Sequence, residues 1–166
     1  MNKINLGCGK DIKEGYINLD IRQLKGVNIV HDLNNYPWPF KNNSFDEVYC
    51  RDSIEHLIDL HKAMTEIKRI CRKNAVVRII VPYYHSSSAL YPVHHFQFNV
   101  DTFRFCYSSF KLNKIKLMPS KLGVFIPPLP LPKKLFPNIL NLRHMVSYLL
   151  GEIILKIDFE FRVIKD

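Results

Sequence analysis

Acidic residues are missing from a long part of this chain. The 166 residues carry a formal net charge of +9, yet no aspartate or glutamate occurs from Thr102 to Gly151. A charge block of this kind is commonly a solvated surface. The alternative is a surface that faces an anion, such as phosphate, nucleic acid or an acidic membrane. Its cations are Arg104, Lys111, Lys114, Lys116, Lys121, Lys133, Lys134 and Arg143.

Other absences narrow the class of protein. The four cysteines show no short spacing typical of metal ligands, and no signal-peptide pattern opens the chain. We therefore expect reduced thiols in a cytoplasmic protein. No apolar run reaches the roughly 20 residues that span a bilayer. With 47% apolar residues and no internal repeats, the chain is expected to form one domain over residues 1–166.

Short apolar runs alternate with a helical pattern in the first half. We expect strands over residues 3–6, 16–21, 27–33, 45–51 and 75–82. Apolar residues at steps of three and four predict a helix over 53–73, between the last two of these strands. A strand, a helix and a strand at this spacing indicate a βαβ unit and a parallel sheet.

The second half changes character. Two further strands are expected over 110–118 and 156–165, and the strict apolar–polar alternation of the latter favours a place near the sheet's edge. Six of the ten prolines fall between Pro119 and Pro137, which excludes regular helix there. An amphipathic helical pattern follows over 139–155. We expect 119–155 to be an insertion that covers the site as a lid or contacts an anionic membrane or a second subunit.

Glycines or an acidic residue follow three successive strands. The first expected strand ends in Gly7-Cys8-Gly9, the second in Asp20 and the third in Asp32. Ligands of open α/β sheets bind beyond the carboxyl ends of the strands. Glycines allow close backbone approach there, and a carboxylate after the second strand can accept both ribose hydroxyl protons. The pattern predicts a nucleoside site, although both aspartates could instead be turn residues.

The run INLGCGK…GYINLDI…HDLNNYPWPFKNNSFDEVYCRDSIEHL resembles the class I S-adenosylmethionine-dependent methyltransferases, of the small bacterial and archaeal methyltransferase-domain type. The similarity covers roughly residues 3–110. It implies an α/β fold with a Rossmann-like, mostly parallel seven-stranded sheet and an antiparallel C-terminal edge strand. Only residues 10–15 separate the glycine turn from the second strand, so the first crossover helix must be abbreviated. No helix is expected before the first strand.

The resemblance also implies which residues bind S-adenosylmethionine. The glycine turn and the residues beside it would hold the methionine part, and Asp20 the ribose. Residues after the second and third strands would flank adenine, and the end of the fourth strand would border the transferred methyl group. The residues are Asn5, Leu6, Gly7, Cys8, Gly9, Asp20, Ile21, Asp32, Leu33, Arg51, Asp52 and Ser53.

Histidines after the fifth strand are the candidates for catalysis. The loop PYYHSSSALYPVHHF resembles a family loop with a Pro-x-His step, which places His94 as the family-like histidine. Methyl transfer depends mostly on positioning and desolvation, and a hydroxyl acceptor also benefits from a base such as His85, His94 or His95. These histidines could instead be hydrogen-bonded loop residues. They could also bind a metal, but no fourth ligand of suitable spacing follows, so no metal is expected.

Structural roles are the alternative for residues around the fourth strand's end. Asp52 or Ser53 could cap the helix that follows, and His56 could orient the start of that helix. The favoured function is methyl transfer to O or N of a small-molecule or glycan-type acceptor, which the basic stretch suggests is anionic. The alternatives are an RNA-binding or RNA-modifying protein on the same fold, and a non-catalytic cofactor-binding partner protein.

Overall fold

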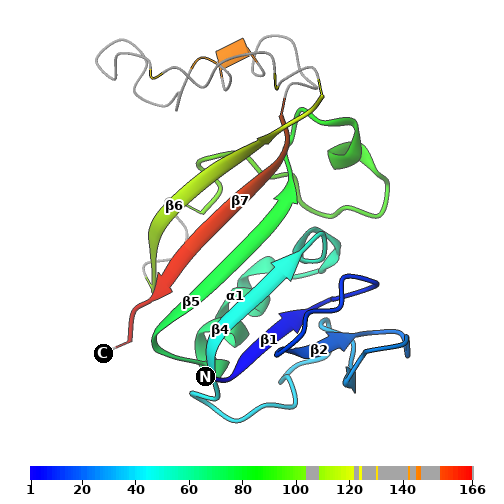
Figure 1. Cartoon of the computed structure of the whole chain (residues 1–166), viewed down its shortest axis with the longest axis vertical. Helices are drawn as coiled ribbons and strands as arrows, with labels where there is room; N and C mark the ends of the chain where they lie inside the picture. Colours follow the sequence, from blue (N-terminus) through cyan, green and yellow to red (C-terminus); the bar gives the residue numbers. More distant parts are fainter. Residues whose placement is uncertain are drawn as a thin grey trace.

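The computed structural model describes residues 1–103, 109–121, 124, 130, 142, 145–146 and 154–165. Seven strands of this described part form one sheet, in the order β3-β2-β1-β4-β5-β7-β6 (Figure 1). All neighbouring pairs up to β5 are parallel, and β7 runs antiparallel to both β5 and β6. The strands are β1 (Lys3–Leu6), β2 (Ile17–Asp20), β3 (Ile29–Val30), β4 (Phe45–Arg51), β5 (Cys71–Pro82), β6 (Phe110–Pro119) and β7 (Ile154–Val163).

The predicted fold class is confirmed, with one difference in strand order. The C-terminal strand β7 is antiparallel, as expected, but it lies between β5 and β6, and β6 takes the edge. The apolar–polar alternation of β7 wrongly predicted a place near the edge, because the polar face of this strand is partly covered in the structure. Asp158 is buried on that face, where it pairs with Arg78 of β5. A strand can therefore alternate and still lie inside the sheet when its charged side chains pair with those of its neighbours.

The first crossover is abbreviated, as predicted. No helix occurs within residues 1–53, so β1, β2, β3 and β4 are joined by irregular links. The buried side-chain amides of Asn5 and Asn18 hold the link between β1 and β2, which contains no helix. Asn5 Nδ2 donates to Asn18 Oδ1 at 3.0 Å, and Asn18 also accepts from the Lys13 N–H at 2.9 Å. Because the buried amides are hydrogen-bonded, this short link can pack against the sheet.

The predicted helix over 53–73 is divided in the structure. A 3₁₀ turn, η1 (Ile54–His56), comes first, and α1 (Leu60–Ile70) follows. The break occurs because Asp59 is extended and caps α1, its Oδ1 accepting from the Lys62 N–H at 2.9 Å. Ser53 precedes η1 but makes no side-chain cap bond. The cap predicted near residues 52–53 is thus at Asp59 instead.

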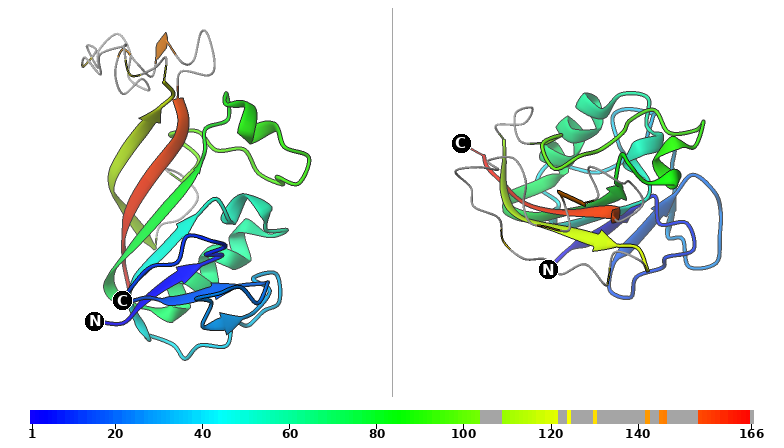
Figure 2. Two further views of the ribbon diagram at one scale, coloured as in Figure 1. Left: turned by 45° about the vertical axis from the view of Figure 1, so that its right-hand side comes forward. Right: turned by 90° about the horizontal axis from the view of Figure 1, so that it is seen from above.

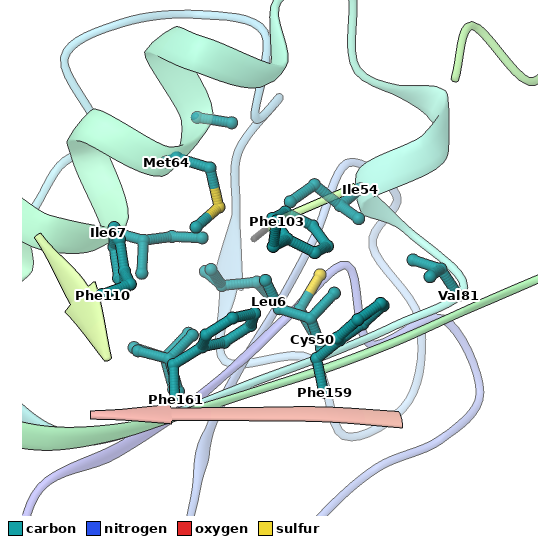
Figure 3. Packing of buried hydrophobic residues seen from close by; sticks show 14 of the residues in the cluster. Leu6, Cys50, Ile54, Met64, Ile67, Val81, Phe103, Phe110, Phe159 and Phe161 are labelled. Carbon is teal, nitrogen blue, oxygen red and sulfur yellow. The ribbon is translucent and has the colours of Figure 1, made fainter. Parts of the chain in front are cut away.

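The hydrophobic core lies on one face of the sheet. In Figure 2, right, α1, η1 and the segment with η2 (Ser87–Leu90) lie on the same side of the strands. Met64 and Ile67 of α1 are fully buried there, and Phe103 packs edge-on to Phe159 and Phe161, with ring centroids 5.0 and 5.3 Å apart (Figure 3). The core therefore fixes β4, β5 and β7, beyond whose ends the loops of the site project.

Predictions for residues 119–155 fall mostly outside the described residues, which bear on them only at the ends. Pro119 of β6 pairs with Ile154 of β7, so the segment joins two paired strands. The helix expected over 139–155 lies largely outside the described residues. Among the residues that the structure describes, no helix is long and apolar enough to cross a membrane.

Glu66 ties the link after β3 to α1. Its Oε2 accepts from the Trp38 N–H at 2.7 Å, and its carboxylate pairs with Arg69 at 2.7 Å. Arg69 in turn donates to the carbonyls of Trp38 and Phe40 at 3.0 and 2.6 Å. One carboxylate thus satisfies both a buried backbone donor and the guanidinium that holds this link.

Glu66→Ala should lower the free energy of unfolding by about 2 kcal/mol, because the Trp38 N–H and Arg69 lose their buried acceptor. Urea denaturation followed by the fluorescence of Trp38, the only tryptophan, measures the change. Glu14 is exposed, so the control Glu14→Ala should shift stability by less than about 0.5 kcal/mol. Equal stability of the two variants would contradict the proposed role of Glu66.

Candidate functional site

A cavity of about 330 Å³ opens beyond the carboxyl ends of β1, β2, β3 and β4. This volume lies in the range of small-molecule sites, and the position is the one at which open α/β sheets bind ligands. Seven of the predicted cofactor residues line it: Gly7, Asp20, Ile21, Asp32, Leu33, Asp52 and Ser53.

Two features favour glycine at position 7, namely its backbone conformation and the close approach of Ser53. Its φ is +62°, in the left-handed region that favours glycine. A Cβ at this position would lie 2.0 Å from Ser53 Oγ and 2.6 Å from Ser53 Cβ. Glycine here lets the end of β1 pack directly against the residue that follows β4, and both residues line the cavity.

Asp20 is a buried acceptor at the end of β2. Its Oδ2 accepts from the Gly9 N–H at 2.7 Å, and its Oδ1 accepts from the Arg22 N–H at 3.0 Å. Burial alone would raise the pKa of this carboxyl, but the hydrogen bonds from Arg22 and Gly9 outweigh it and hold the pKa below its usual range. The group is therefore an oriented carboxylate, and a carboxylate has lone pairs beyond the two that these backbone bonds use.

The cavity joins this carboxylate to apolar walls. Asp32 supplies a second carboxylate, oriented because its Oδ1 accepts from the Asn34 N–H at 2.9 Å. Leu33 is buried, and the side chain of Ile21 is 59% exposed at the cavity. Carboxylates that can accept hydrogen bonds from hydroxyls, beside an apolar surface for a flat base, fit a nucleoside.

Several solved structures have a fold similar to that of this chain. A SAM-dependent methyltransferase from Archaeoglobus fulgidus matches with a TM-score of 0.64 at 16% identity, over 97% of this chain and 85% of that chain. A chain from Haloferax volcanii, described in complex with the Trm112 methyltransferase activator, matches with 0.61 at 15% identity, over 99% and 83%. An S-adenosylmethionine-dependent methyltransferase from Mesorhizobium loti matches with 0.61 at 10%, over 97% and 90%. At these identities the likeness shows the fold.

A family model matches the part of the chain that contains most of the cavity residues. Residues 5–79, which hold the glycine turn, Asp20, Asp32 and the end of β4, match the model described as a methyltransferase domain. Over residues 5–79 the chain is similar to a methyltransferase domain, and its sheet has the fold of S-adenosylmethionine-dependent methyltransferases. It is an enzyme, and its cofactor is S-adenosylmethionine. A comparison with curated protein sequences gave no match.

Five predicted cofactor residues of the methyltransferase do not line the cavity, and the structure gives each another contact. Asn5 bonds to Asn18, as described above, and Leu6 is 1% exposed in the core. Cys8 is buried, which raises the pKa of its thiol, and its N–H donates to the Leu19 carbonyl at 2.9 Å. The Gly9 N–H holds Asp20, and Arg51 is exposed beside Asp52 at 3.5 Å.

Further residues of the methyltransferase cavity escaped the sequence analysis. Arg22 and His31 stand next to predicted residues in the chain, so adjacency alone could have indicated them. His56, which was considered as a helix-orienting residue, also lines the cavity. The residues added by the structure are Arg22, His31, Asn34, His56 and Leu57.

The three candidate catalytic histidines of the methyltransferase have different surroundings in the structure. The ring of His94 lies edge-on to that of the cavity residue His56, with centroids 4.6 Å apart. Burial lowers the pKa of His94, and His56 lowers it further. His85 stacks against Tyr84 at 3.9 Å, and His95 is exposed. His94 therefore has a ring contact with a residue that lines the described cavity.

Glu55 is a buried carboxyl beside these histidines, which no sequence signal distinguished. Its exposed fraction is 1%, and burial raises its pKa to about 7, with a smaller contribution from the charge of Asp52. Its carbonyl accepts from the His95 N–H at 2.8 Å. The turn η1 and the histidine loop are thus joined at this point, at the β4 end of the cavity.

Proposed function

We propose that the enzyme transfers a methyl group from S-adenosylmethionine to an O or N atom of an anionic small-molecule or glycan-type acceptor. The observation that carries this proposal is the position of His56 in the cavity wall, with the ring of His94 against it, since the resemblance places the transferred methyl group at the end of β4. When bound, the cofactor supplies an electrophilic methyl group.

The cofactor residues follow from the same cavity. We propose that Asp20 holds the ribose hydroxyls, and that Ile21 and Leu33 flank the adenine. Gly7 would face the methionine part, and Asp32 the adenine. The support is that these residues line one cavity, with both carboxylates oriented by backbone N–H groups.

The acceptor's proton is handled by the histidine loop in this proposal. His94 is the best placed of the three candidates because its ring contacts His56 of the cavity wall. His85 and His95 would then shape the loop. Tyr91 is exposed, and its ring centroid lies 5.6 Å from that of His94.

The charge of the chain supports an anionic acceptor. Lys111, Lys114 and Lys116 lie on the edge strand β6, and the other cations of the acid-free stretch except Lys121 lie outside the described residues. The strand β6 lies at the opposite edge of the sheet from β3, so these lysines would attract an anion only through the long-range field of the protein, which salt weakens.

Transfer of a labelled methyl group to matched acceptors tests the acceptor class. We expect a phosphorylated glycan or nucleotide sugar to be methylated at least tenfold faster than the same sugar without phosphate. The preference should shrink when salt rises from about 0.05 to 0.5 M, because screening weakens charge attraction. Labelling of RNA alone would favour the RNA-modifying alternative. Equal rates for the charged and neutral sugars would remove the anionic acceptor.

Location, domain organisation and partners complete the proposal. We propose a cytoplasmic enzyme, supported by the free thiols of Cys8, Cys50 and Cys71 in the described chain. Residues 1–166 would form one methyltransferase domain, with 119–155 as a lid or a contact for a membrane or second subunit. A protein partner is also open to test, since the Haloferax volcanii relative is described with an activator.

A further inference from the structure

Glu55, His56 and His94 form a cluster with unsatisfied polar atoms. One ligand atom of each lies within 4.8 Å of those of the other two. Neither carboxylate oxygen of the buried Glu55 has a hydrogen-bond partner of good geometry among the described residues, and the same holds for the buried Nδ1 of His94. Backbone groups of Ser53 and Glu55 lie near the carboxylate, and that of Ala89 lies near the His94 ring, without satisfying these atoms fully. Buried polar groups are nearly always paired, because an unpaired one costs free energy. These atoms are therefore arranged for a ligand.

We propose that Glu55, His56 and His94 bind a divalent transition-metal ion beside the cofactor cavity. Two imidazole nitrogens and one carboxylate oxygen form a ligand set that suits Zn²⁺, and such a set leaves a coordination position open. Mg²⁺ and Ca²⁺ prefer oxygen ligands. The site should therefore bind Zn²⁺ or Co²⁺ and bind Mg²⁺ poorly.

Hydrogen bonds already orient the proposed ligands. His56 Nδ1 lies 3.2 Å from the Val93 carbonyl, and a carbonyl can only accept, so Nδ1 carries the proton and Nε2 keeps its lone pair. Ligating histidines generally use their second nitrogen in this way. The bond from the His95 N–H to the Glu55 carbonyl fastens the loop that bears His94 to η1.

The spacing requires a small contraction on binding. A tetrahedral ion with bonds of about 2.1 Å holds its ligand atoms about 3.4 Å apart. The three atoms, within 4.8 Å of one another, would have to approach by about 1 Å. His56 is exposed, so its ring can turn to make this approach without disturbing the core.

The neighbouring cations, Lys156 and Arg51, pair with Asp52 and not with Glu55. Asp52 accepts a hydrogen bond from Lys156 and lies 3.5 Å from Arg51. These two cations neutralise Asp52, whereas no ion pair with Glu55 occurs among the described residues. A cation at the cluster would supply the missing charge.

The ion would add a chemical role to the site. Because His56 lines the cavity, a hydroxyl of the acceptor could occupy the open position, where the ion would lower its pKa. His94 would then act as a ligand of the ion and not as a free base. This role rests on the proposed function, whereas binding of the ion does not. No metal was expected from sequence, because no fourth ligand of suitable spacing accompanies the histidines of the loop. Glu55 and His56 are far from His94 in the chain.

The test uses the full-length chain without a polyhistidine tag, stripped with chelator, with neither cofactor nor acceptor present. Titration with Co²⁺, followed by its visible absorption, and with Zn²⁺, followed by calorimetry, should each give one ion per chain. Glu55→Gln, His56→Gln and His94→Gln should each weaken binding at least tenfold. His61→Gln, at an exposed position of α1, is the matched control and should bind as the unaltered chain does.

Absence of stoichiometric binding to the unaltered chain would overturn the proposal, as would unchanged binding in all three variants. Displacement of Co²⁺ by an equal concentration of Mg²⁺ would overturn the choice of ion. Thermal unfolding separates a folding defect from ligand loss, because the ion should raise the Tm of the unaltered chain and of His61→Gln only. Ion binding without any methyl transfer would instead count against the proposed function alone.

Discussion

Gly7→Ala should weaken binding of S-adenosylmethionine at least 100-fold, about 2.7 kcal/mol. The new Cβ would lie 2.0 Å from Ser53 Oγ, and the residue would keep a φ of +62° that alanine rarely adopts. Ser53 is buried, so the end of β1 or the turn after β4 must move. Both line the cavity, so the site is distorted along with the fold. Calorimetric titration with the cofactor measures the loss.

Two further variants separate the clash from the backbone strain. Gly15 also has a positive φ, +75°, but a Cβ there meets nothing within 4 Å. Gly15→Ala should therefore cost only about 1 kcal/mol of stability and leave cofactor affinity within about threefold. Ser53→Gly removes the atoms that the Gly7→Ala Cβ would meet, so the double variant should recover part of the affinity relative to Ser53→Gly. If Gly7→Ala binds cofactor as tightly as Gly15→Ala does, the close packing is irrelevant to the site.

Asp20→Ala should raise the Kd for S-adenosylmethionine about 100-fold. The variant removes the proposed ribose acceptor and leaves the N–H groups of Gly9 and Arg22 without the carboxylate that holds them. Loss of a buried acceptor costs about 1–3 kcal/mol, so stability should also fall. Calorimetry measures the affinity, and urea denaturation the stability.

The control is Asp11→Ala. Asp11 is exposed on the same link between β1 and β2, where Arg51 lies 4.0 Å from it, so its removal should change affinity less than twofold. The pH dependence adds a second check. Because the pKa of Asp20 is lowered by folding, its stabilisation should be complete above about pH 4 and lost as the pH falls through the folded pKa. A Kd unchanged by Asp20→Ala would refute the ribose assignment.

Local sequence signals were sufficient to locate the strands of the sheet, although not their order, and part of the cavity. The strand over 45–51 was predicted with the bounds that the structure shows, because Phe45 and the run Val48-Tyr49-Cys50 have strand composition. Gly7 and Asp20 could be found because strand ends and turn residues are adjacent in the chain. These signals are local, and parallel topology then brings the strand ends to one edge of the sheet.

Tertiary contacts decided what the sequence missed. The extended backbone of Asp59 breaks a helical pattern that is continuous by composition. The order of β7 and β6 depends on the pairing of Asp158 with Arg78 across strands. Glu55, His56 and His94 meet only because the loop after β5 returns to η1, and neither spacing nor periodicity encodes that return.

The pairing of Pro119 with Ile154 has a consequence for variation in chain length. Pro119 and Ile154 form the last pair of the β6–β7 ladder, so the number of residues between them does not set the register of the two strands. The closure entropy of such a segment grows only logarithmically, about 0.6 kcal/mol for each doubling of length. The chain can therefore lengthen or shorten at this point at little thermodynamic cost, and its positive charge can change with it while the cavity at the other strands stays intact.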